Sequence, residues 1–98
     1  MIRHICMFKL KEENNQANLQ EALVRVQSLK SIEQIRRFEV VCNAEGMPDS
    51  NYELALIFDF DNARELQIYQ DHPLHKAFGA FITAVRDGRA CIDYEFEL

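Results

Sequence analysis

The sequence lacks any cluster of basic residues. Its 11 Lys and Arg are outnumbered by 16 Asp and Glu, which gives a formal charge of −5, and Arg36-Arg37 is the one adjacent basic pair. Proteins that bind nucleic acids usually carry a basic face, because neutralising phosphates supplies much of the affinity, and anionic membranes attract basic segments in the same way. We therefore expect neither a nucleic acid nor a membrane as a partner.

Long apolar runs are absent as well. No stretch approaches the roughly 18–20 apolar residues that cross a bilayer, and the N-terminus leads into an alternating segment rather than the apolar region of a signal peptide. The three cysteines, Cys6, Cys42 and Cys91, are far apart and form no CxxC pair. We therefore expect a cytoplasmic protein whose cysteines are free, buried thiols rather than metal or redox sites.

Motifs that hold cofactors are also missing. There is no GxGxxG, Walker loop, GxSxG or CxxC, which removes most cofactor-dependent enzymes, so we expect no cofactor. A metal site built from His4, His72 and His75 requires all three side chains to converge across a proline, and we expect no metal. Asp59 and Asp61 lie at the end of an apolar segment, where solvated or capping carboxylates are the usual outcome.

The pattern of apolar residues predicts seven elements in one domain that covers residues 1–98. Alternation predicts strands over residues 2–10, 35–42, 52–60 and about 90–98. Helical spacing predicts helices over residues 14 to about 29, from 62 to the proline at 73, and from 73 to a turn at Asp87-Gly88. Asn62 and Glu65 have the spacing of a capping box at the start of the second helix.

The order β-α-β-β-α-α-β predicts an α+β, ferredoxin-like subunit with a four-stranded antiparallel sheet. In that layout the helices cover only one face of the sheet. The first three strands nonetheless carry apolar residues on both faces, which leaves an apolar surface open to solvent. A chain of 98 residues also has a small core, to which a second subunit would add buried area. We therefore expect a homodimer in which two sheet faces close into a barrel.

The stretch His72-Pro73-Leu74-His75-Lys76 is the most distinctive candidate for chemistry. If the proline opens a helix, His75 lies in its first turn, where the positive end of the helix dipole favours a neutral imidazole that can act as a base. Tyr69, about one turn upstream, could donate a hydrogen bond to the oxygen of a developing enolate. Core packing of Tyr69 and local hydrogen bonding by the histidines explain the same residues without chemistry, so both interpretations stay open.

Four segments, in order along the chain, resemble the stress-responsive A/B barrel domain (Dabb) family: His4 to Lys11, Tyr52 to Phe60, Tyr69 to Lys76, and Asp93-Tyr94. The resemblance covers essentially the whole chain and implies a dimeric α+β barrel of ferredoxin-like subunits. Most members have no assigned activity, and some are stress-induced plant proteins.

One branch of the Dabb family contains polyketide cyclases that close a ring by aldol condensation without a cofactor. The positions of the catalytic tyrosine and histidine of that branch match Tyr69 and His75, and His4 matches a histidine that lines the same cavity. The resemblance therefore implies catalytic roles for these three residues.

Two hypotheses follow from the residues and the resemblance. In the first, a pocket between sheet and helices binds a small apolar carbonyl compound; His75 removes an α-proton, Tyr69 stabilises the enolate oxygen and His4 orients the substrate, as in a cofactor-independent aldol-type cyclase or lyase. In the second, the protein is a noncatalytic, stress-associated dimeric scaffold whose histidines support its structure. An open pocket reached by both Tyr69 and His75 favours the first, and a filled core favours the second.

Overall fold

The computed structural model describes all 98 residues, and its elements follow the predicted order. They are β1 (Ile2–Leu10), α1 (Asn15–Val26), a 3₁₀ helix η1 (Gln27–Ser31), β2 (Arg37–Cys42), β3 (Leu54–Phe60), α2 (Ala63–Asp71), α3 (Pro73–Val85) and β4 (Arg86–Glu95). The strands form one antiparallel sheet in the order β2-β3-β1-β4, which confirms the predicted α+β, ferredoxin-like fold. None of the helices combines the length and apolar composition that crossing a membrane requires.

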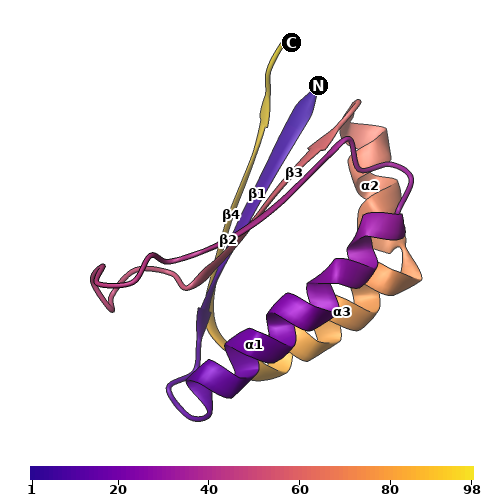
Figure 1. Ribbon diagram of the computed structural model, residues 1–98. Helices are drawn as coiled ribbons and strands as arrows, with labels where there is room; N and C mark the ends of the chain where they lie inside the picture. The colour runs from indigo at the N-terminus through magenta and orange to yellow at the C-terminus, as the bar shows by residue number, and fades with distance from the viewer.

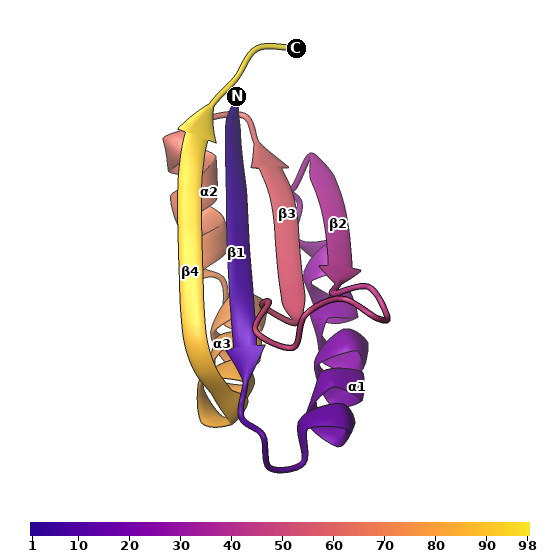
Figure 2. The same ribbon diagram turned by 90° about the vertical axis from the view of Figure 1, so that its left-hand side faces the viewer.

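The three α-helices lie on one face of the sheet and leave the other face bare (Figure 1). Figure 2 shows that bare face, with β1 and β3 in the middle and both chain termini at the same end of the sheet. Side chains alternate between the two faces of a strand, so every second residue of β1 and β3 points toward the helices. These inward residues form the sheet side of the core: His4, Cys6, Phe8, Leu10, Leu54, Leu56, Phe58 and Phe60.

Side-chain caps mark the starts of α2 and α3 and fix the position of His75. The Asn62 side chain accepts a hydrogen bond from the Glu65 backbone N–H at 3.0 Å, as the predicted cap requires. His72 caps α3, because its Nδ1 accepts from the Leu74 backbone N–H at 3.1 Å, and Pro73 takes the first helical position. His75 therefore lies in the first turn of α3, as predicted.

The last helix ends earlier than the sequence indicates. Asp87-Gly88 was expected to close it, whereas α3 ends at Val85 and β4 begins at Arg86. Strand pairing explains the difference: Arg86 is the register partner of Leu10 and Gly88 that of Lys9, with a shift in register between them. The apparent turn residues thus belong to the strand, since a neighbouring strand is present to satisfy their backbone groups.

The two carboxylates at the end of the third predicted strand differ. Asp61 is exposed, as expected, whereas Asp59 is buried, which corrects the expectation for that residue. Asp59 is buried and accepts two hydrogen bonds from Arg3, at 2.8 and 3.0 Å. Asp61 pairs in the same two-pronged way with Arg36, at 3.2 and 3.1 Å. Both arginines come from segments distant in sequence, so the pairing depends on the fold.

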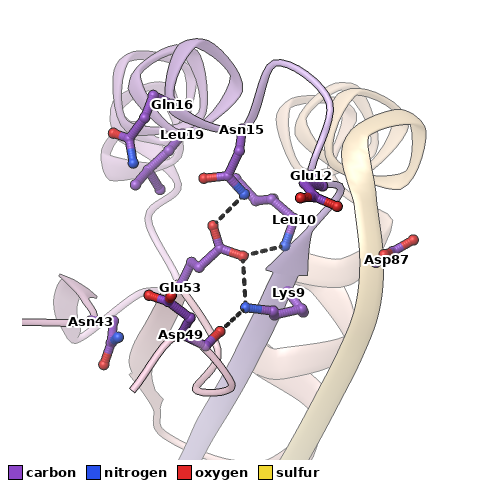
Figure 3. A pocket seen from close by; sticks show the side chains of 10 residues that line it. All are labelled: Lys9, Leu10, Glu12, Asn15, Gln16, Leu19, Asn43, Asp49, Glu53 and Asp87. Carbon is purple, nitrogen blue, oxygen red and sulfur yellow. Dashed lines mark hydrogen bonds and ion pairs between the residues drawn. The ribbon is translucent and has the colours of Figure 1, made fainter. Parts of the chain in front are cut away.

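A polar hollow of about 530 Å³ lies where the loop between β2 and β3 meets β1 and the start of α1 (Figure 3). Its centre is Glu53, whose two carboxylate oxygens accept hydrogen bonds from the Leu10 backbone N–H at 3.0 Å and from Asn15 Nδ2 at 2.6 Å. Lys9 approaches Glu53 to 3.4 Å and also donates to the Asp49 carbonyl. The groups at the centre of this hollow thus bind one another and tie the long loop to the sheet.

Cys6 and Cys91 form a disulfide, so the expectation of free, buried thiols was wrong for this pair. They are direct register partners on β1 and β4, with Cα atoms 4.3 Å apart, although they are 85 residues apart in the sequence. Cys6 is buried and Cys91 is exposed, whereas Cys42 is free and exposed. Sequence spacing carries no information on which strands are neighbours, and therefore could not reveal the pair.

Removing the disulfide, by a reductant or by Cys91→Ser, is expected to lower the free energy of unfolding by about 2–4 kcal/mol. The physical reason is that the cross-link restricts the unfolded chain over a long loop. Urea titrations with and without reductant measure the effect. Cys42→Ser is the matched control and should keep the full response to reductant. Three reactive thiols per chain in the unfolded, unreduced protein would contradict the pairing.

Candidate functional site

A cavity of about 280 Å³ lies between α3, the end of α2 and the β1–β4 side of the sheet. We call it the His75 pocket. It brings together all three residues singled out from the sequence, namely His4, Tyr69 and His75. Thirteen residues line it: His4, Cys6, Phe8, Leu56, Tyr69, Gln70, His75, Phe78, Gly79, Ile82, Thr83, Arg86 and Arg89.

The Tyr69 ring lies close to both histidines of the pocket. Its centroid lies 4.6 Å from that of His75 and 6.2 Å from that of His4. The residue is only 1% exposed, because it closes the core against Phe58 and Phe60. Burial raises the pKa of Tyr69 above its ordinary value of 10.0, so the hydroxyl stays protonated at neutral pH. Tyr69 therefore presents a hydrogen-bond donor at the pocket.

His75 is held as a neutral imidazole of defined tautomer. Its Nδ1 lies 2.9 Å from the Gln70 carbonyl oxygen, which can only accept, so Nδ1 carries the proton and Nε2 keeps a free electron pair. Burial is the main cause that lowers the pKa of His75 below 6.5, and the charges of His4 and Arg89 act in the same direction. The Gln70 hydrogen bond and Asp71 oppose this shift. His75 thus has the properties of a general base near neutral pH.

His4 is oriented by a carboxylate that was not predicted to be a site residue. Its Nδ1 hydrogen-bonds Asp93 Oδ1, and the two residues are register partners on β1 and β4. His4 is 4% exposed, whereas Asp93 is exposed. Since the carboxylate accepts the Nδ1 proton, Nε2 is the nitrogen of His4 that remains for other contacts. Asp93 belonged to a segment that resembled the Dabb family, but its partner became visible only with the strand register.

Arg86, Arg89, Gln70 and Thr83 also line the pocket and were not predicted. Gln70 contributes through its backbone carbonyl, which any residue could supply, so no sequence signal marks it. Arg86 and Arg89 reach the pocket because β4 starts directly after α3, whereas the sequence placed a turn there. His72 does not line the pocket; it caps α3.

The larger, polar hollow around Glu53 contains none of these residues. Its central groups already hydrogen-bond one another, and only two of its ten lining residues are hydrophobic, whereas ligand pockets usually combine an apolar lining with a few free polar groups. We therefore take the smaller His75 pocket as the candidate site.

Two groups of residues are candidates for a metal site, and the geometry of neither fits a metal ion. The set His4, His72 and His75 does not converge, because His72 faces the backbone of α3. A ring nitrogen of His4 and the sulfurs of Cys6 and Cys91 lie within 4.8 Å of one another, but the two sulfurs are bonded to each other. Metals bind thiolates, so the disulfide does not fit this role.

Comparisons with known proteins agree with the fold and with the sequence resemblance. A structure from Bacteroides fragilis, described as a dimeric protein of unknown function with a ferredoxin-like fold, is 32% identical, covers 97% of this chain and 95% of its own, and has a TM-score of 0.84. A Dabb family protein from Mesorhizobium loti is 26% identical, covers 98% and 96% of the two chains, and has a TM-score of 0.81.

A dimeric ferredoxin-like protein of unknown function from Thermobifida fusca is 24% identical, covers 97% and 90% of the two chains, and has a TM-score of 0.87, which supports the fold alone. No curated protein matches the sequence significantly. The family model for the stress responsive A/B barrel domain matches residues 2–96. The chain therefore belongs to the stress responsive A/B barrel domain (Dabb) family.

Proposed function

We propose that the protein binds a small carbonyl compound in the His75 pocket and that Tyr69 and His75 act on it as hydrogen-bond donor and general base. One arrangement carries the proposal: a protonated hydroxyl and a neutral imidazole with a basic Nε2 border the same cavity, with ring centroids 4.6 Å apart. An enolisation step needs both groups at once, a donor for the carbonyl oxygen and a base for the α-proton.

In the proposed step, the ligand's carbonyl oxygen accepts a hydrogen bond from the Tyr69 hydroxyl while His75 Nε2 takes a proton from the α-carbon. The electron pair of the broken C–H bond forms the enolate, whose negative charge builds up on the oxygen next to Tyr69. His4, oriented by Asp93, contacts the ligand from the β1 side and positions it. The enolate carbon then attacks a second carbonyl group of the ligand. A C–C bond forms as the π bond of that carbonyl breaks, and the new alkoxide takes the proton back from His75 Nε2, which completes an aldol-type ring closure without any cofactor.

The volume of the pocket limits the ligand. About 280 Å³ is slightly below the roughly 300–1,000 Å³ typical of small-molecule sites, so a compound with one ring is favoured over a long polyketide chain.

A noncatalytic scaffold requires no cavity beside Tyr69 and His75, and the presence of one supports the enzyme hypothesis over the scaffold hypothesis.

We also infer that two copies of the chain associate through the bare faces of their sheets. We call this surface the open face; its apolar residues are Ile5, Met7, Val41, Ala55, Ile57, Ala90, Ile92 and Tyr94. Several are strongly exposed, Ile92 at 59%. An apolar patch of this extent on a small chain is typical of an interface, and two of the similar structures are described as dimeric. The His75 pocket lies on the other face of the sheet and stays accessible in such a dimer.

The chemical proposal predicts that the protein accelerates exchange of α-protons in a simple aromatic ketone. With acetophenone in D₂O, followed by ¹H NMR, His75→Ala should reduce the protein-dependent rate by roughly a hundredfold or more, because the base is lost. Tyr69→Phe should reduce it by about a hundredfold, because the donor to the enolate oxygen is lost.

His72→Asn is the matched control for these variants. It removes a histidine three residues from His75, and asparagine preserves the cap of α3, so the rate should not change. Full activity of folded His75→Ala and Tyr69→Phe would contradict the assignment. Failure of a range of aromatic and β-keto carbonyl compounds to raise the melting temperature would favour the scaffold hypothesis.

The lowered pKa of His75 makes a prediction about pH. The NMR titration midpoint of His75 should lie below pH 6.5. The protein-dependent exchange of ligand α-protons should therefore persist at pH 6.5 and fall only at lower pH, as His75 becomes protonated. The unfolded chain, with an ordinary histidine, takes up the proton first; this contribution to stability is therefore complete above pH 6.5 and declines as the pH falls below it. A midpoint at or above 6.5 would contradict the environment described for this side chain.

The proposed interface predicts that Ile92→Asp yields a monomer. The substitution places a charge in the middle of an apolar contact, where it is desolvated without a partner. Light scattering at low micromolar concentration should give twice the 11.5 kDa chain mass for the wild type and the single mass for the variant. Val24→Asp, on the exposed face of α1, is the control and should remain dimeric. A monomeric wild type would refute the inference.

A further inference from the structure

We infer that the ligand of the His75 pocket carries a carboxylate group, which Arg86 and Arg89 bind. This inference rests on the proposed function and narrows its substrate class from a small carbonyl compound to a small keto acid. It starts from the arginines of the chain, which divide into two groups according to their partners.

Carboxylates of the chain pair with four of its seven arginines, namely Arg3, Arg25, Arg36 and Arg37. Arg64 is exposed on α2. The two that remain, Arg86 and Arg89, form no ion pair or side-chain hydrogen bond, although the chain has an excess of acidic residues, and both line the same pocket. Two unpaired guanidinium groups at one cavity form a site for an anion.

Arg86 supplies an independent observation. Its Nε is buried and has no hydrogen-bond partner in the chain, and it is the one buried side-chain nitrogen or oxygen of which this is true. A buried donor without a partner destabilises the fold, so native proteins rarely keep one without a reason. A carboxylate is the group that satisfies it best, because its two oxygens match the two parallel N–H groups of a guanidinium.

The lining of the pocket has one sign of charge. None of its thirteen residues is Asp or Glu, and the nearby Asp93 carboxylate is already hydrogen-bonded to His4, whereas a cationic ligand would meet Arg86 and Arg89. Arg89 and the proposed base, His75, line the same cavity of about 280 Å³. A carboxylate bound at Arg89 is therefore close enough to the base for one small molecule to bear both the anion and the reacting carbonyl.

A matched pair of probes isolates the contribution of the carboxylate. 4-Oxo-4-phenylbutanoate and its methyl ester share the aromatic ketone and differ in the charge. Isothermal titration should give an affinity for the acid that is at least about tenfold higher than for the ester, the range expected for a hydrogen bond to a charged group. The advantage of the acid should shrink as salt concentration rises, and the affinity for the ester should not change.

Variants assign this advantage to the two arginines. Arg89→Gln and Arg86→Gln should each weaken binding of the acid by about tenfold or more and leave the ester within about twofold. Arg89→Lys should restore part of the affinity. Arg64→Gln makes the same change in net charge outside the pocket and should bind the acid like the wild type. Arg89 is exposed, so its variant is expected to fold even if that of Arg86 does not.

The outcomes separate this inference from the proposed function. Equal affinities for acid and ester, or an acid preference that survives both arginine substitutions, would overturn the carboxylate site and leave the carbonyl chemistry standing. If 4-phenylbutanoate, which has no carbonyl group, binds as tightly as the keto acid and with the same dependence on arginine, the anion site is supported and the carbonyl chemistry loses its support. Binding of neither acid nor ester to the folded protein overturns both.

Discussion

The register between β1 and β4 is the constraint on which the rest of the site depends. These strands come from opposite ends of the chain, and their antiparallel pairing sets His4 opposite Asp93, Cys6 opposite Cys91 and Phe8 opposite Arg89. A slip of one residue would turn every side chain of β4 to the other face of the sheet. One strand pairing thus determines the orientation of His4, allows the disulfide to form and places the Arg89 guanidinium at the pocket.

The disulfide adds a covalent tie to this pairing. β4 is an edge strand, held through its backbone by β1 alone, and most of its residues are exposed. Edge strands have fewer contacts than central ones and open more readily. Joining Cys6 to Cys91, which lie in the middle of the two strands, keeps the Asp93 carboxylate beside His4 and the arginines beside the pocket.

The pocket and the open face lie on opposite sides of the same sheet. The helices cover one side (Figure 1), and the pocket lies on that side, between α3, the end of α2 and the sheet. Tyr69 lies in the last turn of α2 and His75 in the first turn of α3, so the break between the helices places a donor and a base next to each other. A continuous helix would place residues six apart on different sides, because six residues span about 600° of rotation.

Much of the fold and part of the site could be predicted from local sequence. Alternation and helical spacing, the Asn62 cap and the Pro73 helix start identified the elements in their correct order, because these signals act within a few residues. The motif at His72 to His75 and Tyr69 just before it identified two residues that the structure brings to one pocket. The apolar residues of the open face could also be predicted, since their position follows from strand alternation alone.

What the sequence determined by itself was the set of elements and the candidate residues within each of them. Only the tertiary structure decided which residues meet: the Cys6–Cys91 bond, the His4–Asp93 pair, the burial of Asp59 against Arg3, and the entry of Arg86 and Arg89 into the pocket. Each of these joins segments far apart in the chain. The physical reason is that local propensity fixes a strand or a helix, whereas strand neighbours and their register depend on the packing of the whole sheet against its helices.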